Sequence, residues 1–114
     1  MQIQIHTDHH IEGHEALVTW ATGEIKNALR HHSAQIMRVE VHLGDENGHK
    51  SGGKDKRCVM EVRLQGRAPL AVTEHAQTLY LCVTGAAEKL ARMIDSTLGR
   101  AARTDIAPPD VAAE

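Results

Sequence analysis

The sequence has very few aromatic residues: no Phe, one Trp and one Tyr among 114 residues. Sheets of the RRM type stack RNA bases on aromatic rings, so this shortage argues against that class. No run approaches eighteen apolar residues, which argues against a membrane-spanning helix. The opening residues, MQIQIH, lack the charged and apolar regions of a secretory signal. We therefore expect a cytoplasmic protein.

Cysteine is scarce and the net charge is small. The two cysteines, Cys58 and Cys82, do not make a disulfide framework, and a reducing compartment would keep both as thiols.

With neutral histidines the net charge is −2, so the overall charge gives no support for nucleic-acid binding, and we expect no DNA partner. An argument for RNA binding must therefore depend on how the charged residues are distributed over the molecule.

The remaining composition is that of a globular domain, with 41% hydrophobic and 25% charged residues. A chain of this length can build one modest core. We assign residues 1–104 to this single domain. Residues 105–114 include two prolines, and we expect them to form a disordered tail.

Hydrophobic periodicity predicts four strands and two helices. Apolar and polar residues alternate, as in half-buried strands, in residues 1–6, 36–44 and 57–66, and residues 68–76 are predicted to form a short fourth strand that Pro69 begins or places at an edge. A period of 3.6 residues, typical of amphipathic helices, occurs in residues 14–32 and 78–103. In the second strand the alternation predicts that Met37, Val39, Val41 and Leu43 face the core.

The order β-α-β-β-β-α predicts an α+β fold. A helix joins the first two strands, so these should be parallel, and hairpins make the following strands antiparallel. Both helices must cover apolar surface, which places both on one face of a four-stranded mixed sheet. The other face is expected to stay in water, and it carries Arg38, Glu40, His42, Arg57, Glu61 and Arg63.

The last helix carries a row of cations. At 100° per residue, Lys89, Arg92, Arg100 and Arg103 fall within an arc of roughly 80° that contains no acid. Such a row matches the spaced charge of a nucleic-acid backbone, although any solvated helix face carries Lys and Arg. In the first helix, Lys26 and Arg30 are one turn apart on the polar face and would extend the same surface if the helices lie side by side.

The whole pattern resembles the bacterial ribosome hibernation family, which includes hibernation-promoting factor and protein Y. The resemblance runs over residues 1–103 and rests on the stretches MQIQI, HEAL, VEVHLGDENG, CVMEVRLQG and TLYLCVTGAAEKLARMI. The last of these is similar to the family's D-x-Y-x-A-I-D…K-L-x-R-Q segment. Tyr80, Lys89, Leu90 and Arg92 occupy the matching places.

The resemblance implies a non-catalytic protein that binds the small ribosomal subunit and inhibits translation in stationary phase or stress. The basic faces of the two helices would contact 16S rRNA. The candidate RNA-binding residues are therefore Lys26, Arg30, Lys89, Arg92, Arg100 and Arg103. No catalytic residue, cofactor, metal or membrane partner is expected.

One departure from the family leaves an alternative open. Relatives continue the last helix with a run of Lys and Arg, whereas this chain has DSTLGRAAR. A protein with fewer Lys and Arg side chains releases fewer counterions from RNA when it binds, which predicts weaker and less salt-sensitive RNA binding. The alternative is a diverged member of the same fold that binds a protein partner.

The histidines and cysteines suggest further, weaker hypotheses. The stretch HTDHHIEGH, residues 6–14, could be a metal module, a polar turn before a helix, or a group whose protonation strengthens RNA binding in acidified cells. His10 and His14 have a metal-like i,i+4 spacing, and Gly13 argues against a helical pair. Cys82 is predicted to project toward the cations of the last helix, but no resolving partner suggests a redox role.

Overall fold

The structure, a computed structural model, describes residues 1–8, 14–45 and 55–106, with side chains described as far as Gly99. Within these ranges the elements are β1 (Gln2–Thr7), α1 (His14–Ala28), the 3-10 helix η1 (Arg30–Gln35), β2 (Ile36–Asp45), β3 (Lys56–Leu64), β4 (Leu70–Ala76) and α2 (Leu79–Ile106). The predicted order and the α+β class are confirmed.

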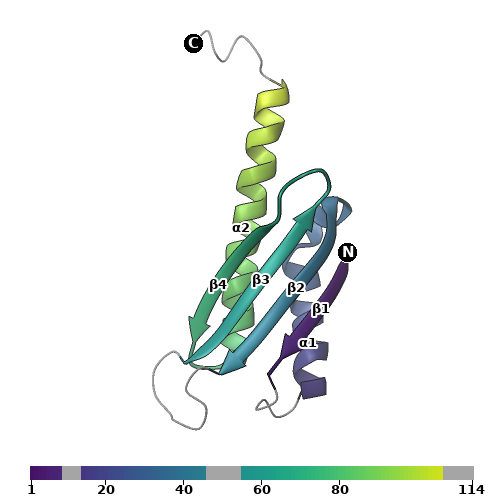
Figure 1. Ribbon diagram of the computed structural model, residues 1–114. Coiled ribbons are helices and arrows are strands. Elements are labelled where there is room, and N and C mark those ends of the chain that lie inside the picture. The colour runs from purple at the N-terminus through teal and green to yellow at the C-terminus, as the bar shows by residue number, and fades with distance from the viewer. Residues whose placement is uncertain (9–13, 46–54, 107–114) are drawn as a thin grey trace.

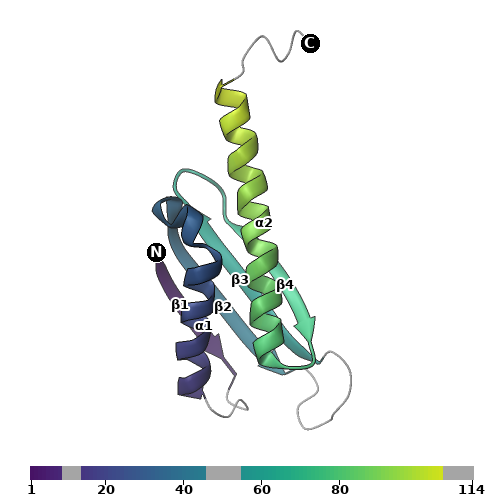
Figure 2. The same cartoon turned by 180° about the vertical axis from the view of Figure 1, so that it is seen from behind.

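The four strands form one mixed sheet in the order β1-β2-β3-β4. β1 is parallel to β2, while β2–β3 and β3–β4 are antiparallel, as predicted. Both helices lie on the same face of this sheet (Figures 1 and 2). Gly66, in the turn before β4, has φ +70°, a left-handed conformation that glycine adopts without a Cβ clash.

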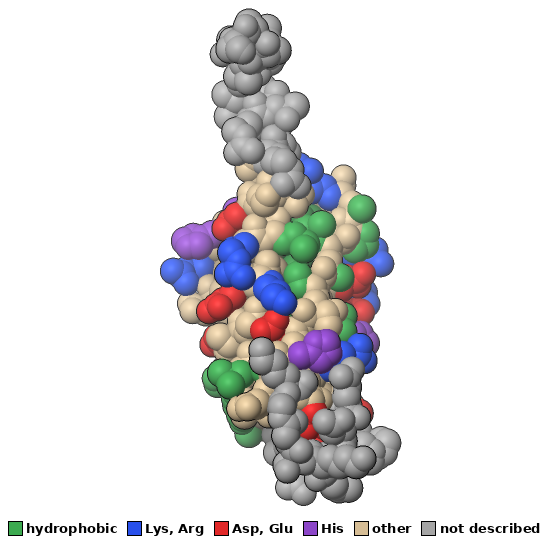
Figure 3. Space-filling model, turned by 90° about the vertical axis from the view of Figure 1, so that its left-hand side faces the viewer, with side chains coloured by type: hydrophobic (Ala, Val, Ile, Leu, Met, Phe, Trp, Pro, Cys, Tyr) green, Lys and Arg blue, Asp and Glu red, His purple; other side chains and the backbone are tan. Residues whose placement is uncertain are grey.

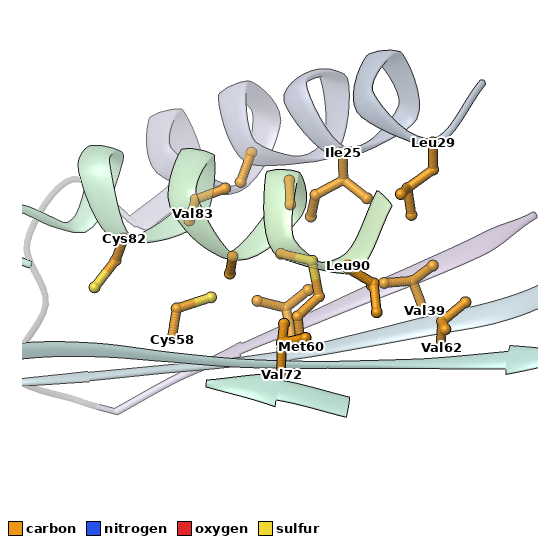
Figure 4. Close-up of a cluster of buried hydrophobic side chains, with 14 of the residues drawn as sticks. Ile25, Leu29, Val39, Cys58, Met60, Val62, Val72, Cys82, Val83 and Leu90 are labelled. Atoms are coloured by element: carbon orange, nitrogen blue, oxygen red, sulfur yellow. The ribbon is translucent and has the colours of Figure 1, made fainter. Parts of the chain in front are cut away.

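The core lies between the helices and the sheet (Figure 4). The 3.6-residue period of α1 and α2 and the two-residue period of the strands bring apolar side chains to this layer from both sides. Its fully buried large members are Ile25, Leu29, Val39, Val41, Cys58, Met60, Val62, Cys82, Val83, Leu90 and Ile94. Because each helix buries its apolar side in this layer, the residues on its opposite side remain exposed to solvent.

The expected position of Met37 in the core is wrong, because its side chain is 57% exposed. Ile36 pairs with Leu64 and Arg38 pairs with Arg63, so Met37 is an extra residue in β2. A bulge of this kind reverses the alternation on one side of it. Ile36 therefore takes the buried position, and the alternation resumes at Val39.

Helix α1 ends at Ala28, four residues before the predicted end. The chain then tightens into η1, none of whose residues is buried. Leu29 before η1 and Ile36 after it are both in the core. A longer α-helix would carry the chain away from the sheet, so burial of both residues favours the tighter turn.

Helix α2 continues through Gly99 to Ile106 and extends past the end of the sheet (Figure 1). It passes the predicted domain end at residue 104, and the rest of the predicted tail, residues 107–114, lies outside the described residues. No helix in the described ranges has both the length and the apolar character needed to cross a bilayer.

Candidate nucleic-acid interface

Thr78 caps the start of helix α2. The hydroxyl oxygen of Thr78 accepts a hydrogen bond from the backbone N–H of Leu81, at 3.1 Å. Such a cap satisfies one of the free N–H groups at a helix start. With Val83, Ala86 and Leu90 buried against the sheet, the side chains of Lys89 and Arg92 are left exposed.

Lys89 is held by the edge strand of the sheet. Its ammonium Nζ lies 2.6 Å from Glu74 Oε1 and donates a hydrogen bond of 3.2 Å to the carbonyl of Thr73, both in β4. Its side chain remains 46% exposed. One carboxylate therefore offsets the charge of a residue that the sequence predicts to bind RNA.

Gly85 makes room for this ion pair. A Cβ placed on Gly85 would lie only 2.6 Å from Glu74 Oε2 and about 3 Å from two carbons of the same side chain. Glu74 thus packs directly over the helix backbone at Gly85, one turn before Lys89. The sequence pattern of α2 alone did not reveal this role of Glu74 and Gly85, because the contact joins two elements.

Arg92 has more open surroundings than Lys89, the other cation of this row whose side chain is described. Its side chain is exposed, and no ion pair or hydrogen bond engages its guanidinium within the part of the chain whose side chains are described. Arg100 and Arg103 lie in the helical part of α2, but their side chains are outside the described set. Of Lys89 and Arg92, Arg92 is therefore the clearer phosphate-binding candidate.

The first-helix cations do not join this row. Trp20 packs edge-on against Tyr80 of α2 with ring centroids 4.7 Å apart, and Thr84 donates a 3.4 Å hydrogen bond to Glu24. These contacts define the side of α1 that faces α2. Lys26 is two positions after Glu24, which places it about 200° around the helix, on the far side.

Arg30 lies in η1 rather than in α1. Its guanidinium donates hydrogen bonds to the backbone carbonyl of Asn27, at 3.1 Å, and to the side-chain oxygen of Asn27, at 2.9 Å. Neither partner is charged, so Arg30 remains an exposed cation beside the end of α1.

Acidic residues separate the two groups of cations. Asp95 of α2 forms an ion pair with His32 of η1, and Glu24 of α1 faces Thr84. Glu88 is seven residues, about two turns, before Asp95 and so lies on the same side of α2. We call Glu24, Glu88 and Asp95 the acidic seam. Figure 3 shows the β4 side of the molecule, where Lys and Arg side chains lie next to acidic ones. The helical layer therefore presents two cationic flanks rather than one continuous surface.

The cysteines are not part of this surface. Cys82, predicted to project toward the cations, is fully buried, and its Sγ lies within hydrogen-bonding distance of two carbonyls, those of Lys56 at 3.1 Å and Glu74 at 3.5 Å, to either of which the thiol can donate. Burial raises the pKa of Cys82 to about 11 and that of Cys58 to about 12. Both thiols are protonated at neutral pH, which makes them poor nucleophiles.

Residues 3–101 match the sequence profile of a family described as Sigma 54 modulation protein / S30EA ribosomal protein. The chain belongs to this family. The match includes all or most of each strand and helix, and it confirms the resemblance expected from the sequence. No curated protein sequence matches this S30EA family member significantly.

Two solved structures share the S30EA family fold seen here. The N-terminal domain of Protein Y from Thermus thermophilus is 19% identical, with a TM-score of 0.66 over 85% of this chain and 99% of that one. A ribosomal subunit interface protein from Coxiella burnetii is 15% identical, with a TM-score of 0.72 over 87% of this chain and 99% of that one. At these identities the likeness establishes the fold.

Proposed function

We propose that this protein binds the small ribosomal subunit through 16S rRNA and inhibits translation in the cytoplasm under stress or in stationary phase. Its membership of the S30EA family supports a role at the ribosome. The role is one of binding rather than catalysis, and it needs no cofactor. The observation that carries the proposal is this family match together with the exposed cations on the helical layer.

The proposed RNA contacts lie on the two cationic flanks. The flank beside β4 holds Arg92 and Lys89, and the same helix face continues in sequence toward Arg100 and Arg103. The flank on α1 and η1 holds Lys26 and Arg30. Each cation that neutralises a phosphate releases a counterion, so the binding free energy should depend on salt concentration.

Co-sedimentation with purified small subunits across a salt series tests this proposal. The wild type should pellet at low salt and progressively less as salt rises. Arg92→Glu replaces an attractive contact with a repulsive one, and we expect it to reduce the pelleted fraction at every salt concentration. Arg63→Glu, an equal charge reversal on the opposite sheet face, is the matched control and should pellet like wild type.

A second candidate function is binding of a protein partner by a diverged member of the same fold. The acidic seam and the Lys89–Glu74 ion pair favour it, because both reduce the charge available for RNA. Under this alternative, pelleting with small subunits is weak, does not depend on salt, and is the same for Arg92→Glu and Arg63→Glu. That result would contradict the first proposal.

A further inference from the structure

The open face of the sheet, opposite the helices, holds a cluster that the RNA interface does not use. His6 of β1, Glu40 of β2 and His42 of β2 each offer one ligand atom, and these atoms all lie within 4.8 Å of one another. The imidazole rings of His6 and His42 are stacked, with centroids 4.6 Å apart and planes 15° apart. The fold therefore brings these three side chains close together.

Parallel pairing of β1 with β2 brings these residues together. His6 is registered with His42, and Gln4 is registered with Glu40. Because side chains alternate along a strand, residues 4, 6, 40 and 42 share one face. Val39 and Val41 point to the other face and are fully buried, which anchors the backbone beneath the cluster.

We propose that His6, Glu40 and His42 bind a divalent transition-metal ion, with Zn²⁺ as the first candidate. Two imidazole nitrogens and one carboxylate oxygen form a ligand set suited to Zn²⁺ and its neighbours in the first transition row. Three protein ligands leave at least one coordination position for water or for a group from another molecule. The strongest sequence signal for metal, the stretch 6–14, contributes only His6 to this set.

Binding requires a small movement of the side chains. Ligand atoms about 2.1 Å from a tetrahedral zinc ion are roughly 3.4 Å apart, which is closer than the upper limit of 4.8 Å found here. Stacked rings must also tilt until their nitrogen lone pairs point to one centre. Both histidines are exposed, so rotation about their side-chain bonds meets little packing resistance.

Charged neighbours act on this site in opposite directions. Arg38 hydrogen-bonds to Glu40 Oε2, which orients the carboxylate and leaves Oε1 able to bind a metal ion. The guanidinium also repels a cation. Glu61 is paired with Glu40 across β2 and β3, and its negative charge on the same face offsets part of that repulsion. We therefore expect a site of moderate affinity.

Calorimetric titration of the untagged full chain with Zn²⁺ tests the proposal. The wild type should bind one equivalent, and the double variant His6→Ala/His42→Ala should bind none at this site. Removing even an outer partner of a metal ligand weakens binding roughly 10–100-fold, so Glu40→Gln should weaken it by about tenfold or more. Zn²⁺ should also raise the Tm of the wild type, because the three ligands are brought together only in the folded chain.

Control variants separate this site from other histidines. His75→Ala removes a histidine from β4 of the same sheet, and His9→Ala/His10→Ala removes two from the stretch 6–14. Both variants should still bind one equivalent of Zn²⁺, and Zn²⁺ should still raise their Tm. Absence of Zn²⁺ uptake by the wild type overturns the proposal. Uptake that survives in His6→Ala/His42→Ala, with its circular dichroism unchanged, also overturns it. Neither result bears on the RNA interface, which lies on the other face.

Discussion

An ion pair with Glu74 limits how much charge Lys89 of α2 offers to a ligand. Glu74 holds Lys89 against β4, so the ammonium group must leave a carboxylate before it can neutralise a phosphate. Exposed ion pairs of this kind contribute little to folding, typically below about 1 kcal/mol. Their loss should therefore affect RNA binding more than stability.

Glu74→Gln is expected to strengthen binding to small ribosomal subunits. The change removes the competing carboxylate and leaves Lys89 available to phosphate. We expect the slope of log affinity against log salt to steepen by roughly 0.7–0.9, the value for one added phosphate contact. Equilibrium binding measured at several salt concentrations checks this. Glu61→Gln, on the opposite sheet face, is the control, and an equal effect of both variants would contradict the local explanation.

Gly85→Ala provides an independent route to the same result. The added Cβ would meet the Glu74 side chain at 2.6 Å, so this side chain must move away from the helix and from Lys89. Alanine also favours the helix by about 1 kcal/mol over glycine, which offsets part of the cost of that movement. The salt series should resemble that of Glu74→Gln, and wild-type behaviour would show that the ion pair survives.

The buried thiols predict a loss of stability at alkaline pH. The pKa of Cys58 rises from 9.0 to about 12 and that of Cys82 from 9.0 to about 11, mainly through burial. Above pH 9 the unfolded chain loses these protons while the folded chain keeps them, so the free energy of unfolding falls as pH rises from 9 toward 11 and 12. Urea unfolding at pH 8 and pH 10 measures the decrease.

The double variant Cys58→Ala/Cys82→Ala isolates the contribution of the thiols. It should be less stable at pH 8, because two buried side chains are shortened, but its stability should fall less between pH 8 and pH 10. An equal fall in wild type and variant would mean that other groups cause the pH dependence.

At the scale of elements, the bulge in β2 decides which of two adjacent residues supports the fold. Ile36 is 3% exposed and Met37 is 57% exposed. Ile36→Ala should lower the free energy of unfolding by about 2–4 kcal/mol, as in other cores, while Met37→Ala should change it by less than about 0.5 kcal/mol. Urea denaturation of the two variants checks this. A larger loss of unfolding free energy in Met37→Ala than in Ile36→Ala would mean that Met37, not Ile36, is the core residue.

The elements themselves were predictable from the sequence because their signals are local. The periods of two and 3.6 residues place Val39, Val41 and Leu90 in the core, and all three are buried. The bulge at Met37 was missed because a single extra residue does not interrupt a run of apolar side chains. It becomes visible only from the pairing with β3.

The candidate site was less predictable than the fold, because its decisive contacts join distant segments. The arc of cations predicted for the last helix correctly identifies Arg92 as exposed. It cannot show that Glu74 reaches Lys89. Likewise, the spacing within residues 6–14 cannot reveal that His6 stacks on His42. These partners are fixed by the order of strands and helices in three dimensions, not by local sequence.

At the scale of the whole molecule, the arrangement of charge matters more than its sum. The net charge is −2, so long-range attraction to RNA is weak and the proposed RNA binding would depend on the two cationic flanks. The acidic seam lies between these flanks. At 0.1 M salt the screening length is about 10 Å, so charges on adjacent helices still influence each other.

Removing charge from the seam should therefore strengthen binding more than removing the same charge elsewhere. In Glu88→Gln/Asp95→Asn the repulsion between the seam and phosphate is reduced where RNA would span both flanks, and we expect a severalfold gain in affinity for small subunits that shrinks as salt rises. Glu40→Gln/Glu61→Gln brings the net charge to the same value from the opposite face of the sheet. If both double variants bind equally well, overall charge explains the gain; a larger gain in the seam variant shows that RNA lies across the helical layer.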